Sequence, residues 1–245
     1  MAQFGFGAGT AIAVDSGANP TPLDFNALQE WGVSFSASTK EMFGAKQFAL
    51  AVARGTAKIT SKLKFGVLDG RIFNTLMFGG TMSTGQTVLN IDVATTIPAT
   101  PFQITAAPAT GFADLGVEDV TTGLRMVRVA SAPATGQYTV TAVGLYTYAA
   151  ADTGKAIRYS FSNTQTTSGN SVALSNPLLG TSSFFKLVLS AAQGGLRNTT
   201  ILNANQANKL DFGTKIEDFM MPEMEASAFA DSSDNIGIYT QAEAT

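Results

Sequence analysis

The sequence predicts a mainly β protein: an antiparallel β-sandwich or barrel with one short flanking α-helix and an inserted small β-sandwich module. Three features indicate this class: apolar and polar residues that alternate between positions 31 and 65, one short segment of helical periodicity, and a change of composition near residue 95. We therefore expect a first domain in two segments, 1–94 and 169–245, separated by an outward-facing module at 95–168.

The clearest strand covers residues 57–65, where apolar and basic side chains alternate with a period of two. The apolar set is Ile59, Leu63 and Phe65, and the basic set is Lys58, Lys62 and Lys64. This pattern is typical of a strand that buries one face and exposes the other. A similar alternation of Trp31, Val33 and Phe35 with small residues predicts another strand earlier in the chain.

A short helix is expected from Asp69 to Phe78. Asp69 is a suitable N-cap, and the glycines that follow Phe78 supply a stop. The apolar residues of the segment fall on one side at helical spacing, and they are Ile72, Phe73, Leu76 and Met77. Because so short a helix is marginal alone in water, we expect this side to pack against the 57–65 strand.

The N-terminal and middle segments carry weaker signals. Residues 1–30 are rich in glycine and turn residues, which predicts an extended arm with little core of its own. Short runs rich in strand formers predict the inserted β-sandwich, and they lie at 102–106, 126–130, 137–141, 145–148 and 156–161. The polar stretch 162–171 predicts a linker that ends the insertion.

The C-terminal segment resumes the first domain. Residues 184–189 have the pattern of a buried strand. Pro222 predicts a sheet edge or a break within 211–229, because proline cannot donate to a strand ladder. The polar tail from Asp231 onward is expected to be loose or held by a partner.

Composition argues against most catalytic chemistry. The 245 residues include no histidine and no cysteine, which removes the commonest general base, the commonest metal ligand and thiol catalysis. Charged residues make up only 13% of the chain, against roughly 25% in ordinary soluble domains, and mean hydropathy is +0.15. So little charge indicates an outer surface buried by neighbouring copies, although an alanine-rich proteome would give a similar composition.

No signal for export or membrane insertion is visible. The first basic residue is Lys40, so the N-terminus lacks the cationic region of a signal peptide. No apolar run reaches the roughly 18 residues of a membrane helix. We therefore expect synthesis in a cytoplasm and no membrane partner.

The constellations that suggest chemistry are weak. Glu223 and Glu225 lie two residues apart, so an extended chain places both carboxylates on one face about 7 Å apart, as a paired-carboxylate hydrolase requires. A face that forms salt bridges with the three lysines explains the same residues more simply. The triplet Asp152-Thr153-Gly154 matches aspartic proteases, but it has no second copy, so a turn is favoured. We expect no catalytic residue, cofactor or metal.

Charge is distributed unevenly along the chain. Residues 40–71 carry seven basic and two acidic side chains, whereas 209–245 carry two basic and eight acidic ones. Opposite patches suit self-association through complementary faces, although they can equally pair within one chain. The candidates for a subunit interface or a lumen are Lys58, Lys62, Lys64, Asp211, Glu217, Asp218, Glu223 and Glu225. The net charge of −3 argues against a nucleic-acid-binding protein.

Short runs in both halves of the chain carry a family resemblance. They are 43–48 (FGAKQF), 53–59 (ARGTAKI), Lys64-Phe65, 69–74 (DGRIFN) and 217–231 (EDFMMPEMEASAFAD). These runs resemble the tail tube, or major tail, proteins of long-tailed bacteriophages. Two more runs, 132–138 (APATGQY) and 146–155 (YTYAAADTGK), look like a small β module that is inserted in phage structural proteins. None of these runs is a catalytic signature.

The resemblance implies the tail-tube fold, a β-sandwich or barrel flanked by a helix, in which six copies close into a ring and rings stack into a tube. It also implies a virion tail location, partners among the other phage tail proteins, and passage of phage DNA during genome ejection without specific binding. A neutral or acidic lumen repels phosphates and permits sliding. We therefore expect some acidic candidates to face the lumen or to pair with lysines of an adjacent subunit.

Two other functions remain open from the sequence. An adhesive or carbohydrate-binding β-sandwich on a virion or cell surface requires an aromatic-lined pocket. The only tryptophan, Trp31, lies in a core-like alternation, and most of the five tyrosines lie in the expected insertion. A hydrolase would use Glu223 and Glu225 as its carboxylate pair.

Overall fold

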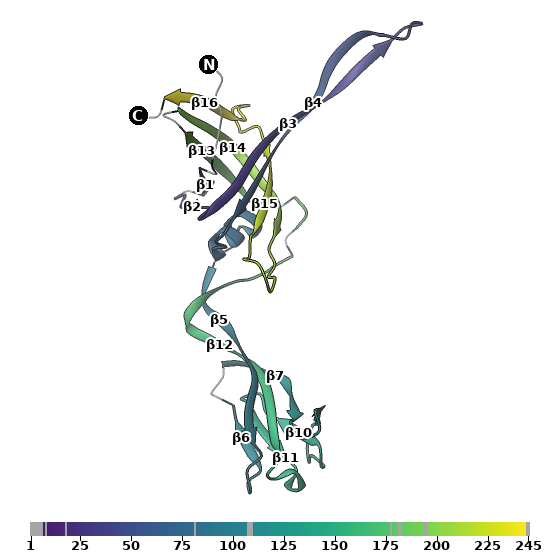
Figure 1. The fold of residues 1–245 in the computed structure, drawn as a ribbon, viewed down its shortest axis with the longest axis vertical. Helices are drawn as coiled ribbons and strands as arrows, with labels where there is room; N and C mark the ends of the chain where they lie inside the picture. Colours follow the sequence, from purple (N-terminus) through teal and green to yellow (C-terminus); the bar gives the residue numbers. More distant parts are fainter. Residues whose placement is uncertain are drawn as a thin grey trace. The chain divides into compact units, whose positions relative to one another are not determined.

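The computed structural model describes residues 7, 9–17, 19–80, 82–106, 110–176, 178–180, 183–193 and 196–243. The chain forms two compact units, and the prediction of a mainly β fold with antiparallel sheets and one short helix is confirmed (Figure 1). The first unit combines Met1–Met82 with Val172–Thr245, and the second, here called the module, is Ser83–Ser171.

The first unit is built on one eight-stranded sheet whose pairings are all antiparallel. Its order is β2-β1-β13-β14-β15-β4-β3, with β16 paired to β14. The strands are β1 (Thr10–Asp15), β2 (Pro22–Asp24), β3 (Leu28–Phe43), β4 (Ala49–Phe65), β13 (Phe184–Gln193), β14 (Leu196–Asp211), β15 (Glu223–Phe229) and β16 (Gly237–Glu243).

Strand β4 confirms the predicted alternation. Leu63 and Phe65 are buried in the core of the first unit, whereas Lys62 is exposed and Lys64 half-buried. The neighbouring strands place Met224 of β15 in the same core, opposite Leu63 in the strand register. One face of the sheet is therefore apolar and covered, and the other face is polar.

The predicted N-terminal arm is wrong for the part of it that the structure describes. Strands β1 and β2 join the sheet, and they bury Ala11, Ala13 and Leu23. Phe25, which follows β2, packs edge-on against Phe65 with 5.1 Å between ring centroids. The segment therefore contributes to the core, because pairing with β13 and β2 turns one face of β1 inward, while Ile12 and Val14 on its other face are only half-buried.

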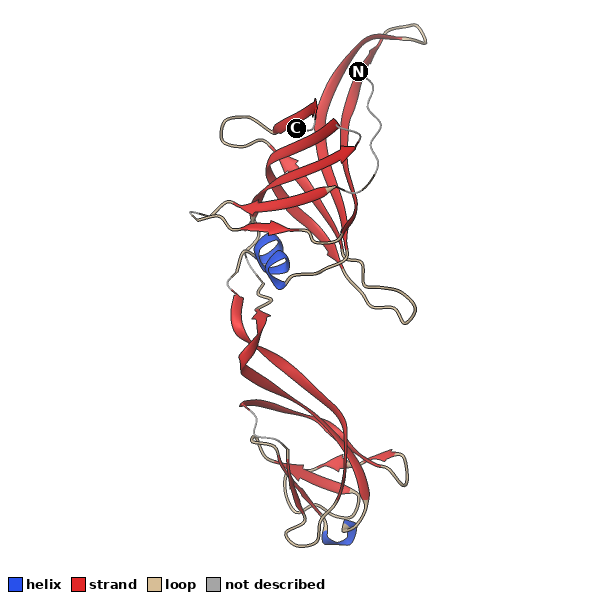
Figure 2. Ribbon diagram, turned by 60° about the vertical axis from the view of Figure 1, so that its left-hand side comes forward, coloured by secondary structure: helices blue, strands red, loops and turns tan. Residues whose placement is uncertain are grey.

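The helix forms where it was predicted. It consists of α1 (Gly70–Ile72) and a π-helical turn η1 (Phe73–Phe78), and it lies at one end of the curved sheet (Figure 2). The Asp69 carboxylate accepts a hydrogen bond from the Arg71 amide as N-cap, and Gly79 ends the helix with φ 61°. Ile72 and Leu76 are buried in the core that also contains residues of β4, and η1 contacts β14.

The C-terminal part agrees with the sequence at Pro222 and differs from it in the tail. The chain breaks between β14 and β15, and β15 begins directly after Pro222, as expected for a residue that cannot donate to the ladder. The prediction of a loose tail from Asp231 is wrong for Gly237–Glu243, which forms β16 and pairs with β14. The side chain of Ile238 is exposed, so β16 belongs to the sheet without contributing this residue to the core.

The module is a small β-sandwich of two four-stranded sheets, ordered β5-β12-β7-β8 and β6-β11-β10-β9. Its elements are β5 (Met82–Thr96), β6 (Gln103–Thr105), β7 (Thr110–Asp119), β8 (Leu124–Arg125), β9 (Val127–Arg128), β10 (Gln137–Val140), β11 (Leu145–Tyr148), the 3₁₀ turn η2 (Ala150–Asp152) and β12 (Ala156–Val172). The predicted linker at 162–171 is wrong because these residues continue β12.

Buried tyrosines dominate the core of the module. Tyr146 is fully buried, and Tyr138, Tyr148 and Tyr159 are nearly so. The hydroxyls of Tyr138 and Tyr146 donate to the two carboxylate oxygens of Asp114, at 2.7 and 2.9 Å. The Asp114 side chain is only 4% exposed, so these hydrogen bonds satisfy polar groups that have left water.

Candidate interaction surfaces

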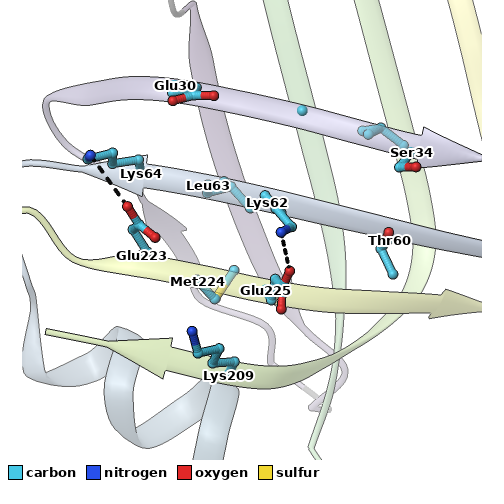
Figure 3. A pocket seen from close by; sticks show the side chains of 12 residues that line it. Glu30, Ser34, Thr60, Lys62, Leu63, Lys64, Lys209, Glu223, Met224 and Glu225 are labelled. Atoms are coloured by element: carbon cyan, nitrogen blue, oxygen red, sulfur yellow. Dashed lines mark ion pairs between the residues drawn. The ribbon is translucent and has the colours of Figure 1, made fainter.

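The polar face of the first unit carries charged residues in rows that run across the strands. In the first row, Lys64 of β4 lies opposite Glu30 of β3 on one side and Glu223 of β15 on the other, and Glu223 lies opposite Asp211 of β14. In the second row, Lys62 is followed by Glu225 and Lys209 (Figure 3). We call Glu30, Lys58, Lys62, Lys64, Lys209, Asp211, Glu223 and Glu225 the charged face.

Ion pairs form within one chain on this face. The Lys62 Nζ lies 2.6 Å from Glu225 Oε1, and the Lys64 Nζ lies 3.4 Å from Glu223 Oε1. Lys209 pairs with Asp211 on its own strand. The hydrogen bond and charge of Lys62 lower the pKa of Glu225, and those of Asp211 raise the pKa of Lys209.

The structure thus brings together most of the interface or lumen candidates. Lys58, Lys62, Lys64, Asp211, Glu223 and Glu225 lie on adjacent strands, and pairing within one chain accounts for two lysine–glutamate contacts. Glu217 and Asp218 do not belong to the charged face, because they lie in the loop between β14 and β15. Residues from β3, β4, β14 and β15 line a hollow of about 390 Å³ over this face.

The geometry gives no support to a carboxylate hydrolase. A general acid needs a raised pKa, which burial or a second carboxylate supplies. Here each of Glu223 and Glu225 has a lysine ammonium within 3.4 Å, and the pKa of Glu225 is lowered. The Glu225 carboxylate is therefore held in the ionised form.

A second surface is the long hairpin formed by β3 and β4. Strand β15 pairs with β4 only over residues 59–64, and beyond this point residues 49–58 pair with β3 alone. The result is a two-stranded ribbon that extends past the other strands of its sheet (Figure 1). We call residues 39–54 the hairpin tip.

Apolar side chains are exposed on both faces of the hairpin tip. Val52 lies opposite Glu41 and Met42 lies opposite Ala51, so these adjacent pairs point to opposite faces. The exposed large apolar side chains of the tip are Met42, Phe43, Phe48, Leu50 and Val52. Phe48, at 85% exposure, stands in the turn region. Few monomeric proteins leave such a cluster uncovered.

A third surface is the loop 212–222 between β14 and β15, which we call the acidic loop. Its base is fixed to the helix by an edge-on contact between Phe212 and Phe73, with ring centroids 5.9 Å apart. Its far part exposes Ile216 and Phe219 almost completely, next to the exposed carboxylates of Glu217 and Asp218. A hollow of about 490 Å³ lies against this loop.

The module offers no aromatic platform for a sugar. The tyrosines of the module are buried in its core, and Phe161 is buried with them. Over residues 83–106 and 110–171, the exposed large apolar side chains are aliphatic. Within the described residues of the module, a carbohydrate-binding site therefore lacks the exposed aromatic ring that it requires.

Comparison with known proteins supplies no family. No protein-family model matches the chain, and no curated protein matches it. Among the described helices, none is long and apolar enough to cross a membrane. The functional reading therefore depends on the three surfaces above and on the sequence resemblance.

Sequence reasoning found the charged face and missed the apolar tip. Leu50 and Val52 alternate with alanines, which is the pattern of an ordinary half-buried strand. That pattern does not say where the neighbouring strand stops, and β15 stops short of the tip. The basic residues Lys40, Lys46 and Arg54, which lie among these apolar residues, were a signal that the segment is exposed.

Proposed function

We propose that the chain is a structural subunit that assembles with copies of itself into the tail tube of a long-tailed bacteriophage. The observation that carries this proposal is the hairpin tip, which exposes apolar side chains on both faces where no described strand other than its own partner pairs with it. A two-stranded ribbon is marginally stable in water by itself. Contact with neighbouring subunits covers it and removes the apolar surface from water.

The composition supports an assembled state. Only 13% of the residues are charged, and many of those on the charged face already pair within the chain. Charge is what normally keeps a monomer apart from its copies. A chain with so little free charge is suited to permanent contact with other copies.

The resemblance to tail tube proteins supplies the proposed arrangement. Six copies close into a ring, rings stack into a tube, and the tube joins the other tail proteins of the virion. The curved antiparallel sheet with the helix Asp69–Phe78 at one end is consistent with this family. Closing a ring through sheet edges also satisfies backbone groups that an open edge leaves exposed.

The charged face is our candidate for the wall of the lumen or for a subunit contact. Four lysines and four carboxylates lie on it, so its formal charge is balanced. Three of the lysines, Lys62, Lys64 and Lys209, already have a carboxylate partner. A wall of this kind presents few free cations to phosphates, which suits DNA that must slide through without being held.

The direct test is assembly of the purified protein. We expect negative-stain electron microscopy to show rings or tubes with a central hole, and sedimentation velocity to show growth with concentration. The variant to compare with the wild type replaces Met42, Phe48 and Val52 by serine. It should keep the fold intact and abolish assembly. A wild-type protein that stays monomeric at every accessible concentration contradicts the proposal.

A further inference from the structure

We infer that the hairpin tip of one copy docks on the acidic loop of a neighbouring copy, with Phe48 entering the hollow beside that loop. This inference rests on the proposed self-assembly and adds which two surfaces meet. It follows from two features of the first unit that each lack a partner: an exposed apolar tip with basic residues, and an exposed apolar loop with acidic ones.

The hollow beside the acidic loop has a lining suited to an aromatic side chain. Its apolar lining residues are Leu210, Phe212, Phe219 and Met221, and charged residues that include Lys215 and Asp218 line the rest. Phe212 packs on Phe73 of the helix, so the base of the hollow is held against the helix. Aromatic residues that fill a pocket on a partner are the usual anchors of protein interfaces.

Phe48 is the tip residue best placed to be such an anchor. It is the most exposed of the large apolar side chains in the tip, and it is the last residue of the turn that joins β3 and β4. It projects from a ribbon that leaves the sheet of its own unit. A side chain in this position reaches a second molecule more readily than its own core.

Charge complementarity favours a second copy as the occupant. The tip carries Lys40, Lys46 and Arg54 against Glu41 alone. The loop carries Glu217 and Asp218 against Lys215 alone. Counting ion pairs among the residues that the structure describes, none of the tip cations and neither of these loop carboxylates is engaged. Contact between copies therefore brings opposite, unneutralised charges around an apolar centre.

The two surfaces are different parts of the chain, so the contact is head-to-tail. After the first contact, the pair of copies retains one free tip, on one copy, and one free loop, on the other. A head-to-tail contact closes into a ring only if its rotation allows, and otherwise continues as an open filament. This docking thus provides directional growth of the assembly.

Cysteine cross-linking tests the contact directly, because the chain has no cysteine of its own. Phe48→Cys protein is mixed with Phe219→Cys protein under mild oxidation, and the products are separated on a denaturing gel. We expect disulfide-linked dimers in the mixture in clear excess over those in either variant alone. Equal yields in the mixture and in Phe48→Cys alone overturn the docking.

Assembly measurements separate this inference from the proposed function. Phe48→Ser and Phe219→Ser should each raise the protein concentration needed for assembly about 10-fold or more, because each removes buried aromatic surface from the contact. The control is Val143→Ser in the module, an exposed residue that should leave this concentration unchanged. Lys46→Glu should weaken assembly, and adding Asp218→Lys should restore it.

Two outcomes tell the failures apart. If the wild-type protein assembles and both serine variants assemble equally well, the docking is wrong and the proposed function stands. If the wild-type protein remains monomeric at every concentration, both are wrong.

Discussion

The Lys62 ammonium lies 2.6 Å from the Glu225 carboxylate, across the neighbouring strands β4 and β15 of a single chain. The two residues are far apart in the sequence and meet because Met224 and Leu63, one position away on each strand, are opposed in the core. Register set by buried side chains therefore decides which charges meet on the polar face.

The pair makes a first prediction about titration. Lys62 lowers the pKa of Glu225, so the pair stabilises the folded state fully above the ordinary glutamate pKa and loses this contribution as pH falls through the lowered value. We expect Lys62→Met to raise the pKa of Glu225, as measured by NMR titration of the side-chain carboxyl. Lys58→Met is the control and should have a smaller effect, because Lys58 acts only through its charge.

Reversal of the same charge should affect assembly more than folding. Lys62 is 74% exposed, so Lys62→Glu should leave the urea midpoint of the monomer nearly unchanged. It places two carboxylates opposite each other and unbalances the charged face, so assembly should be impaired. The double exchange of Lys62→Glu with Glu225→Lys restores an opposite pair and should recover assembly. Normal tubes from Lys62→Glu alone would show that Lys62 makes no ion pair with an adjacent subunit.

The sequence predicted those parts of the fold in which local pattern and burial agree. The alternation at 57–65, the cap at Asp69 and the stop at Gly79 are local features, and the structure confirms each. Asp69 shows why, because its carboxylate bonds to the Arg71 amide two residues away. No distant contact is needed to place these elements.

The misses arise where distant pairing overrides local composition. Ala11 and Ala13 appear too small to mark a core strand, yet β1 is held between β2 and β13. The polar residues 162–171 belong to β12, which pairs with β5. Most of their side chains are exposed to solvent, which is why their composition resembles that of a linker. At the candidate surfaces, the charges were predicted, but their partners depend on a register that only the folded sheet fixes.

A third prediction concerns the N-terminal strands. Phe25 is 3% exposed and packs on Phe65, which is fully buried. Phe25→Ala should lower the free energy of unfolding by about 3–5 kcal/mol, because it leaves a cavity in the core of the first unit. Urea unfolding followed by Trp31 fluorescence measures this, with Ile238→Ala as the exposed control expected within about 0.5 kcal/mol of wild type. An unchanged midpoint for Phe25→Ala would mean that the segment is a loose arm after all.

A fourth prediction separates the stability of the two units. Asp114→Ala leaves the hydroxyls of Tyr138 and Tyr146 without their acceptor, and each buried unpaired hydroxyl costs about 1–3 kcal/mol. The near-ultraviolet circular dichroism of the tyrosines should therefore melt earlier, while the Trp31 fluorescence transition of the first unit stays in place. Asp114→Asn keeps one acceptor oxygen and should lose less. Equal shifts at both probes would contradict independent unfolding of the units.

The last prediction is an alkaline titration of the module. Burial, followed by the hydrogen bonds to Asp114, raises the pKa of Tyr138 and Tyr146, and burial raises that of Tyr148 and Tyr159. A raised pKa stabilises the folded module fully below the unfolded value of about 10 and ceases to do so as pH rises through the folded value.

The titration can be isolated to the module, because Tyr239→Phe removes the only other tyrosine of the chain. In this variant, the ultraviolet absorbance of phenolate should appear at higher pH in the folded protein than in the same protein unfolded in urea. Adding Asp114→Asn should move the folded midpoint down, since it removes the negative charge that opposes ionisation of Tyr138 and Tyr146. Identical folded and unfolded midpoints would mean that the tyrosine hydroxyls are accessible to water. The buried hydrogen bonds from Tyr138 and Tyr146 to Asp114 would then be contradicted.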